Sequence, residues 1–391
     1  MSAAYRHWVW LVALLGLCLG SERAEAAGPE AFLVTYGPGA EVWELFGHNA
    51  LWLRDEQTGL DHSFSFGYFE LDRPGFHLDF ARGIMLYYGA AMPIERELAF
   101  YRSRDRSIQV QRLALSPSQV HHLHGLLDAA IFPAPQYYQY DYFFANCSTW
   151  LRDLLDEVLD GELRASIEPQ PARLNFRDHT RRLTAHQFWL HHGILALLGM
   201  EIDQPRTAWE EAFLPEALAQ SLDTVTIDGQ ALVVETHWLH QSERFNPPGD
   251  ATGRPVSSAL LGLLLAVLLW LGSRLGSGAT QRRWPSRLIA ALLGVLGLAP
   301  MIMWLFTGHE ATHNNLMILL LNPFWLLLWR SPSAPFQAVV LMVLASFSAV
   351  AAIVLSLPGL IQDRPDQVLL LLPVIAALLL LHWTERRKSL A

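Results

Sequence analysis

The sequence predicts an α+β domain outside the cytoplasm, followed by an all-α membrane domain of five transmembrane helices. Two observations lead to this prediction. Apolar residues make up 52% of the 391-residue chain, but after position 255 they concentrate in runs long enough to span a bilayer. Before that position, segments of alternating polarity and segments with a helical apolar period follow one another, which is typical of a compact α+β domain.

The first 27 residues have the features of a signal peptide. A basic residue, Arg6, precedes an apolar stretch from Trp8 to Leu19, and Ala24-Glu25-Ala26-Ala27 matches a signal peptidase site. An uncleaved anchor is the alternative. Cleavage would remove Cys18 and leave Cys147 without a disulfide partner in an oxidising compartment, where a solitary thiol needs a chemical reason.

The membrane domain is expected to span residues 256–383. Basic residues cluster in alternate connections, so the positive-inside rule puts those connections and the C-terminus in the cytoplasm and residues 28–255 on the periplasmic face of a bacterial inner membrane. With a formal net charge of −9 the chain offers no basic face for nucleic acid, and the expected partner is the lipid bilayer. The five predicted spans are Val256–Leu275, Leu288–Phe306, Leu316–Trp329, Phe336–Leu357 and Val368–His382.

Cys147 is the main candidate for a reactive residue. Apolar positions from Trp150 to Leu159 recur every three or four residues and predict a helix that ends near Gly161. Asn146 is a favourable N-cap, so Cys147 would lie on the first turn, where free N–H groups and the helix dipole favour a thiolate. A buried, unreactive cysteine is the alternative.

His48 is the candidate base. Residues 48–54 and 60–67 predict an antiparallel hairpin whose register pairs Trp52 with Ser63 and brings His48, Ser63 and Ser65 to one face. A thiolate mechanism needs a base that a third polar group holds in place, and His48 with Ser65 fits those two positions. A surface histidine is the alternative for His48.

The rest of the outer domain carries weaker signals. Pro74–Gly83 and Tyr87-Tyr88 predict an aromatic-rich loop and strand, most of which we expect to fill the core. Residues 162–222 are largely helical, and an Asp228-Gly229 turn predicts a hairpin from Thr224 to Thr236. We therefore divide the domain into residues 28–162, which hold both candidate residues, and a helical extension with a hairpin at residues 163–250.

The Asn-Cys-Ser-Thr segment, with His48 on a strand about a hundred residues earlier, resembles circularly permuted papain-like thiol enzymes of the NlpC/P60 and lecithin:retinol acyltransferase kind. More closely, the chain resembles the DUF4105 family of Lnb-like lipoprotein intramolecular transacylases. The segments that carry this resemblance are Phe46–Leu51, Gly75–Gly83, Tyr140–Thr149, Ile202-Asp203 with Phe213–Pro215, and Asn315-Leu316 with Asn322-Pro323.

The resemblance implies a permuted papain-like fold for residues 28–162, with Cys147 as nucleophile and His48 as base. It also implies that an acyl chain passes from a glyceryl ester of a membrane lipid or diacylglyceryl lipoprotein, through a Cys147 thioester, to an amine such as a lipoprotein N-terminus. No cofactor and no metal is expected. At the strand end where the family is expected to have Asn-Tyr-Gly, this chain has Ser65-Phe66-Gly67, so Ser65 would orient His48. Further candidates for contacts with the oxyanion or substrate are Tyr142, Asn146, Ser148, Asn49, His309, His313 and Asn315.

Three other functions fit part of the sequence. A peptidoglycan endopeptidase or amidase would use the same Cys147 and His48, but it does not need five spans. The segment His309–His313 has the H-E-x-x-H spacing of zinc proteases, although Asn322-Pro323-Phe324 lacks the aspartate that intramembrane metalloproteases use as third ligand. A non-catalytic membrane assembly protein is the last alternative, because a fold alone does not establish an activity.

Overall fold

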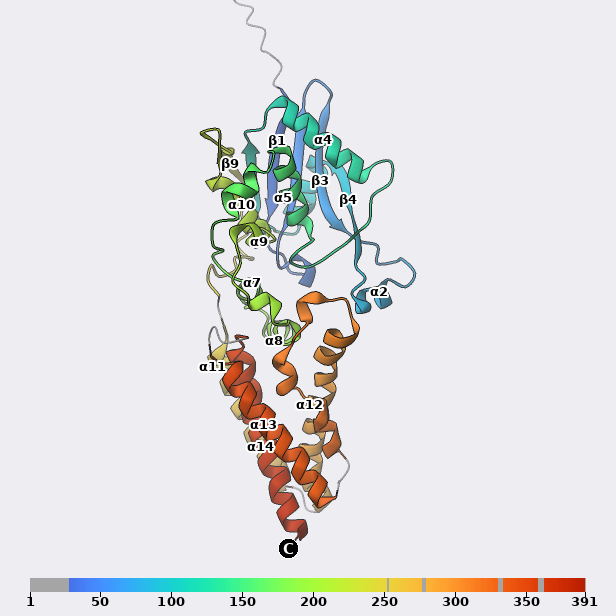
Figure 1. Ribbon diagram of the computed structural model, residues 1–391, viewed down its shortest axis with the longest axis vertical. Helices are drawn as coiled ribbons and strands as arrows, with labels where there is room; N and C mark the ends of the chain where they lie inside the picture. The colour runs from blue at the N-terminus through green and yellow to red at the C-terminus, as the bar shows by residue number, and fades with distance from the viewer. Residues whose placement is uncertain (1–27, 252, 276–278, 330–332, 358–361, 391) are drawn as a thin grey trace, which may run out of the picture.

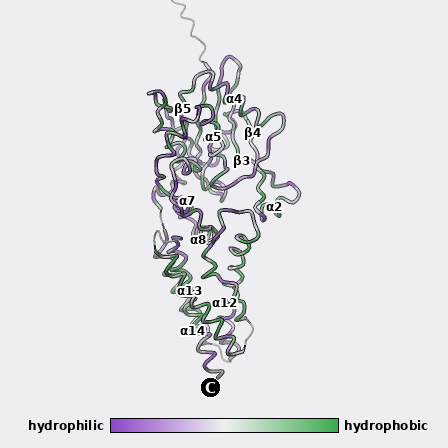
Figure 2. The backbone as a smooth tube through the Cα atoms, in the orientation of Figure 1, coloured by the Kyte–Doolittle hydropathy of each residue, from purple (hydrophilic) through white to green (hydrophobic). Residues whose placement is uncertain are grey.

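The computed structural model describes residues 28–251, 253–275, 279–329, 333–357 and 362–390. The predicted signal peptide, residues 1–27, lies outside the described residues. Figure 1 shows a domain built around a sheet, standing on one end of a bundle of long helices. Residues along most of the bundle are hydrophobic, whereas the domain mixes hydrophobic and hydrophilic residues (Figure 2). An N-terminal α+β domain followed by a helical domain is therefore confirmed.

An antiparallel sheet of seven strands organises the N-terminal domain, in the order β6-β4-β3-β2-β1-β5-β9. A short turn links β2 to β3, and residues 69–85 lead from β3 to β4, whereas β9 joins the far edge from much later in the chain. The strands are β1 (Glu30–Tyr36), β2 (His48–Asp55), β3 (Leu60–Tyr68), β4 (Leu86–Pro93), β5 (Ile108–Leu113), β6 (Tyr138–Gln139) and β9 (Val233–His240).

The predicted hairpin of β2 and β3 has the expected register, because Trp52 pairs with Ser63. The Asp228-Gly229 turn is also present, with both residues at positive φ of 51° and 78°. However, its strands β7 (Thr226–Ile227) and β8 (Gln230–Ala231) have only two residues each. The chain from Val233 onward leaves this hairpin and pairs as β9 with β5, whose open edge offers a longer row of backbone partners.

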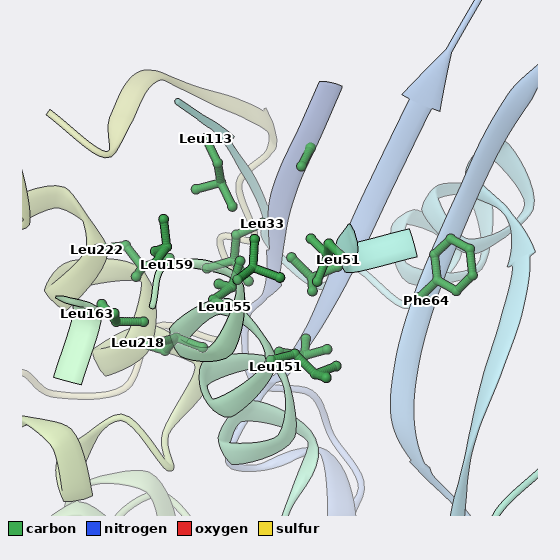
Figure 3. Close-up of a cluster of buried hydrophobic side chains, with 14 of the residues drawn as sticks. Leu33, Leu51, Phe64, Leu113, Leu151, Leu155, Leu159, Leu163, Leu218 and Leu222 are labelled. Carbon is green, nitrogen blue, oxygen red and sulfur yellow. The ribbon is translucent and has the colours of Figure 1, made fainter. Parts of the chain in front are cut away.

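Helices cover both faces of the sheet. On one face, Leu151 and Leu155 of α5 pack against Leu33 and Leu51 of the sheet (Figure 3). Leu218 of α10 belongs to the same cluster, so the extension after residue 162 shares this core. The helices of the domain are α2 (Phe76–Arg82), α3 (Ile94–Ser103), α4 (Pro117–Ile131), α5 (Cys147–Val158), α6 (Glu162–Ile167), α7 (Phe176–Thr184), α8 (Phe188–Leu197), α9 (Ala208–Glu211) and α10 (Pro215–Thr224), with short 3-10 helices η1 (Val42–Glu44) and η2 (Glu201–Asp203).

The opposite face is covered by α3. Ile94 and Tyr101 of this helix form a second cluster with Tyr36 and Ala50 of the sheet. Because side chains alternate along a strand, Leu51 faces α5 while Ala50 faces α3. His48 is two residues from Ala50, and it therefore belongs to the α3 side.

The segment from Pro74 to Gly83 forms α2 rather than a loop. The helix lies between Gly75 and Gly83, which have φ angles of 84° and 85°, a region that favours glycine. Phe76 is buried, but Leu78 and Phe80 are exposed. The expectation that this segment fills the core is therefore wrong for the outward side of α2.

In the described part of the membrane domain, four helices are long and apolar enough to span a bilayer, rather than the five predicted. They belong to α11 (Pro255–Leu275), α12 (Ala279–Phe306), α13 (Ala334–Val354) and α14 (Pro365–Leu390). The predicted span Leu316–Trp329 is instead two short 3-10 helices, η4 (Leu316–Leu319) and η5 (Pro323–Leu328).

Asn322-Pro323 explains why residues 316–329 do not form one helix. Proline has no N–H and disfavours helical backbone in the residue before it, and Asn322 is extended with ψ of 126°, so the helix does not continue through this pair. The side chain of Asn322 accepts a hydrogen bond from the N–H of Phe324 instead. Irregular backbone at membrane depth is tolerated where protein surrounds it, and Met317, Leu320 and Trp325 are fully buried.

The domain and the bundle are joined by hydrogen bonds between backbones and by buried polar contacts. After α12, the segment that contains η3 (Glu310–Thr312) runs back along the domain, where Gly199 N–H donates to Ala311 O at 2.7 Å. At the start of α14, Asp366 lies 3.1 Å from His191 of α8. The domain is therefore seated on the bundle at defined contacts.

Candidate active site around Cys147

Cys147 is the first residue of α5, as predicted, and Asn146 is the N-cap. The Asn146 side-chain oxygen accepts hydrogen bonds from Ser148 N–H at 2.9 Å and Thr149 N–H at 3.1 Å. In return, Asn146 N–H donates to the Thr149 hydroxyl at 2.8 Å. This reciprocal capping satisfies two free N–H groups at the helix start and fixes the backbone conformation on either side of Cys147.

The Cys147 sulfur lies between α5 and the end of the sheet. It is partly exposed, and a methyl group added to Gly67 of β3 would lie 3.8 Å from Cys147 Cβ. Burial raises the pKa of the Cys147 thiol, while hydrogen bonds from Asn49 N–H and from Ser148 lower it to a smaller extent. The net direction is opposite to the expected thiolate, because desolvation outweighs the donors at the helix start.

Two of the candidate substrate residues bind each other instead. The Ser148 hydroxyl donates to Asn49 Oδ1 at 2.8 Å, and Asn49 Nδ2 donates to the Thr35 hydroxyl at 2.8 Å. All three side chains are buried. They therefore connect α5 to β2 and β1 and position the backbone of Asn49 beside the sulfur.

His48 opens β2 and lies among aromatic side chains. Its ring stacks on Tyr36 and Tyr101, with ring centroids 6.3 and 6.2 Å away. Burial, followed by the positive charge of Arg106, lowers the pKa of His48 from 6.5 to about 3. The imidazole is therefore neutral at pH 7.

The structure brings His48 and Cys147 to the same end of the sheet without joining them. Asn49, the residue after His48, faces the sulfur with its N–H group, while the His48 ring lies on the α3 side. Within the described chain no hydrogen bond links the sulfur to the His48 ring. Catalytic hydrogen bonds often form only once substrate is bound, so the two residues remain a candidate pair.

Ser65 forms its hydrogen bonds with groups other than His48. Its hydroxyl lies 3.2 Å from the Tyr68 hydroxyl and 3.5 Å from Glu97 Oε1. Ser63 also donates to Glu97, as does Tyr36 at 3.0 Å. The predicted strand register is right, but a buried carboxylate from α3 binds the serines of that face.

Glu97 and Arg106 were missed by the sequence reasoning. Burial raises the pKa of the Glu97 carboxyl, against hydrogen bonds from Ser63, Tyr36 and Ser65 that lower it. A signal was present, because Glu97 lies on the same helical stripe as Ile94 and Tyr101, where a charge is out of place. Arg106 is buried, donates from Nε to Gly37 O at 2.7 Å, and has no partner for Nη2 in the described chain.

Tyr142 and His309 connect the loop before Cys147 to the bundle. Their rings stack with centroids 6.0 Å apart, and His309 Nε2 lies 2.8 Å from Phe80 O. Tyr142 O accepts a hydrogen bond from Asn146 Nδ2 at 3.0 Å. Tyr142 therefore contacts both the N-cap of the Cys147 helix and the segment that follows α12.

His313 and Asn315 bind backbone carbonyls. His313 Nε2 lies 3.0 Å from Thr307 O, and Asn315 Nδ2 donates to Ala196 O and Leu197 O at 2.9 Å each. The zinc-protease motif needs both histidines on one face of an α-helix, whereas η3 is a 3-10 turn. Among the described residues, no group of three or more His, Cys, Asp or Glu side chains is arranged to hold a metal ion.

Comparison with known proteins addresses the family but not the chemistry. No curated protein and no solved structure gave a significant match, so the permuted papain-like fold stays a prediction. Residues 22–185 match the family model of the Lnb N-terminal periplasmic domain. This match covers Cys147, His48 and the segments between them, and it confirms the resemblance over those residues. Residues 22–185 are therefore similar to Lnb N-terminal periplasmic domains, and the described part of the chain after them contains four helices long and apolar enough to span a membrane.

Proposed function

We propose that this protein is a membrane-bound cysteine acyltransferase that carries an acyl chain on Cys147. The observation that supports this most is the position of that cysteine. Cys147 begins a capped helix beside the N–H of Asn49, and the loop before it contacts the first residues after a membrane helix through Tyr142 and His309. A thiol in this position is suited to a substrate whose reactive ester lies at a bilayer surface.

The reaction has two steps. The Cys147 sulfur attacks the carbonyl carbon of a glyceryl ester as His48 takes the thiol proton, and the C–O bond then breaks while His48 returns the proton to the leaving alcohol. An amine next attacks the thioester carbonyl, the C–S bond breaks, and the proton of the amine passes by way of His48 to the thiolate. The products are an amide, a lipid alcohol and free Cys147.

The electrostatics favour a neutral thiol and a neutral imidazole over a resting ion pair. The pKa of the thiol is raised and that of His48 is lowered, so both groups are neutral before the reaction. His48 would therefore remove the proton during attack. The N–H of Asn49 and those at the start of α5 would donate to the oxyanion, which is where charge develops.

The proposed substrates are a diacylglyceryl lipoprotein or another membrane lipid as acyl donor, and a lipoprotein N-terminus as acceptor. In this proposal α11–α14 span the bacterial inner membrane, with the N-terminal domain in the periplasm and the C-terminus in the cytoplasm. Long apolar helices would keep the enzyme beside acyl chains that cannot leave the bilayer.

The test compares wild type with Cys147→Ser in cells that lack their usual lipoprotein N-acylation enzyme. We expect lipoproteins with an N-terminal amide-linked acyl chain only with wild type, and a thioester on Cys147 by mass spectrometry. Immunoblots for equal amounts of both proteins in the membrane are the control. Unacylated N-termini with wild type, together with no thioester on Cys147, would rule out acyl transfer, and release of muropeptides by wild type alone would identify a peptidoglycan hydrolase instead.

A further inference from the structure

Helix α2 and the residues beside it expose several large apolar side chains. Leu78 is 55% exposed and Phe80 39%, and the neighbouring Leu71 and Ile84 are also exposed. In contrast, Phe76 is buried and stacks on Phe69 with ring centroids 5.6 Å apart. Phe80 lies one turn after Phe76, on the same face of the helix, and stacks on it with ring centroids 6.1 Å apart. Phe76 thus anchors the helix, and we call the exposed apolar side chains in and beside it the α2 surface (Leu71, Leu78, Phe80 and Ile84).

The α2 surface lies beside the end of a membrane helix. Gly308 N–H donates to Arg82 O at 2.7 Å, and His309 Nε2 lies 2.8 Å from Phe80 O. Gly308 is two residues after Phe306, where α12 ends, and Leu305 and Phe306 are themselves strongly exposed. Figure 1 shows α2 at the height where the domain meets the bundle, and Figure 2 shows the hydrophobic backbone of the bundle reaching that height. The apolar exterior of α12 therefore continues toward α2.

The polar residues of α2 fit an interfacial position. Arg73 forms an ion pair with Asp79 at 2.9 Å, and Arg82 and His77 are exposed at the two ends of the helix. Helices that lie in a membrane surface combine an apolar face with basic residues at the level of the head groups. A protein partner is less suited, because the long apolar side of α12 that adjoins α2 has the composition of a bilayer-facing helix.

An aromatic series connects the buried side of α2 with the segment before Cys147. Phe69 lies next to Tyr87 with ring centroids 4.9 Å apart, and Tyr87 stacks on Tyr140 at 4.3 Å. Tyr140 is seven residues before Cys147 and follows β6. A lipid held at the α2 surface would therefore be on the side of the domain from which this aromatic series leads to the thiol.

We propose that the α2 surface inserts into the leaflet nearest the periplasmic domain and binds the acyl chains of bilayer lipids. The proposal needs the bundle to span the membrane, but it does not depend on the chemistry of Cys147. It identifies α2 as the place where the domain itself, and not only the bundle, contacts lipid.

The test uses a full-length chain with Cys18→Ser and Cys147→Ser and one added cysteine for an environment-sensitive fluorophore. The probe is placed by Leu78→Cys, and the matched control is Leu239→Cys on β9, a leucine 40% exposed on the edge strand at the opposite side of the sheet. A third chain with Leu305→Cys on α12 reports whether the bundle is in the bilayer. All three are reconstituted in phosphatidylcholine vesicles with and without lipids that carry a nitroxide near the head group.

We expect the nitroxide lipids to quench the probes at positions 78 and 305 several-fold more than the probe at position 239, and the position 78 probe to emit at shorter wavelength than the control. Quenching at position 305 with no more quenching at 78 than at 239 would overturn the proposal. Repeating the measurement with Ile84→Cys controls for a local effect of the label at position 78. If the probes at both 78 and 84 are quenched no more than the probe at 239, the proposal is likewise overturned. Because these chains lack Cys147, a negative result is distinct from failure of acyl transfer.

Discussion

Tyr142 and His309 stack with ring centroids 6.0 Å apart, although 167 positions separate them in the chain. Tyr142 lies in the loop that leads to Cys147, and His309 lies just after the membrane helix α12. The pair therefore joins the candidate nucleophile to the bundle.

Gly83 is expected to be essential for the contact between α2 and the bundle. A Cβ atom at Gly83 would lie 2.6 Å from the carbonyl carbon of Gly308, so Gly83→Ala must push the two backbones apart. Gly75→Ala is the matched control, because Gly75 has the same left-handed backbone but no atom within 4 Å of an added Cβ. Both variants bear a backbone cost of roughly 1–2 kcal/mol, and only Gly83→Ala adds the clash. Thermal unfolding should show the larger loss for Gly83→Ala, and equal losses would contradict the predicted clash.

Asn146→Ala should lower the stability and disturb Cys147 at the same time. Loss of an N-cap side chain costs about 1 kcal/mol, and Asn146 Nδ2 also donates to Phe213 O at 3.0 Å. Asn175→Ala removes the cap of α7, where the side chain accepts from Asp178 N–H at 2.9 Å, and is the control. We expect both variants to lower the melting temperature, but only Asn146→Ala to change the alkylation rate of Cys147. An unchanged rate would show that the cap does not position the thiol.

Cys147 should react slowly with iodoacetamide at pH 7. Burial raises its pKa above 9.0, so the thiolate fraction at neutral pH is smaller than that of a free cysteine and the rate should still increase above pH 9. Ser148→Ala removes a hydrogen bond that lowers this pKa, so its rate profile should move to higher pH. The measurement is made in a Cys18→Ser chain, with glutathione as the reference thiol. A plateau already reached at pH 7 would mean that Cys147 is a resting thiolate.

Protonation of His48 should contribute to unfolding in acid. Its folded pKa of about 3 lies below the ordinary 6.5, so between these pH values the unfolded chain binds a proton that the folded chain does not. This part of the stability is complete above about pH 6.5 and is lost as the pH falls toward 3. The melting temperature of wild type should therefore fall more steeply from pH 7 to pH 4 than that of His48→Gln.

Arg106→Gln provides a second measurement of the same effect. Loss of the positive charge should raise the folded pKa of His48, which makes the acid slope of the melting temperature shallower than that of wild type. Arg112→Gln, at an exposed ion pair near the far end of β5, is the control for losing one arginine. Identical slopes for wild type, His48→Gln and Arg106→Gln would show that His48 is not held neutral.

Gly297 on α12 should not tolerate a side chain. An added Cβ would lie 2.2 Å from Leu321 O, in the irregular segment between η4 and η5. Gly272 on α11 is the control, since its Cβ would be 3.6 Å from the nearest atom. Alanine is favoured over glycine inside a helix by up to about 1 kcal/mol, so Gly272→Ala should be neutral or stabilising whereas Gly297→Ala should lower the melting temperature in detergent. A stable Gly297→Ala chain would mean that residues 316–328 do not pack there.

Much of the fold was determined by local patterns that the sequence displays directly. Alternating polarity and a turn located the hairpin of β2 and β3 with its register, and Asn146 followed by an apolar period located the start of α5 at Cys147. Four of the five predicted spans are helices for the same reason, since length and hydropathy are local properties. The fifth was wrong because Asn322-Pro323 interrupts the helix and neighbouring segments can surround irregular backbone.

The tertiary structure alone decided what surrounds the candidate site. Ser65 lies on the predicted face, but Glu97 from α3 binds it, and His48 is held among Tyr36, Tyr101 and the charge of Arg106 instead. These partners come from distant segments, and a local sequence pattern does not predict which distant residues contact one another. Burial then reversed the expected pKa direction of Cys147, because desolvation depends on everything packed around the thiol and not on its place in the helix. The residue types and the helix start were therefore readable from the sequence, whereas their protonation states and partners came from packing.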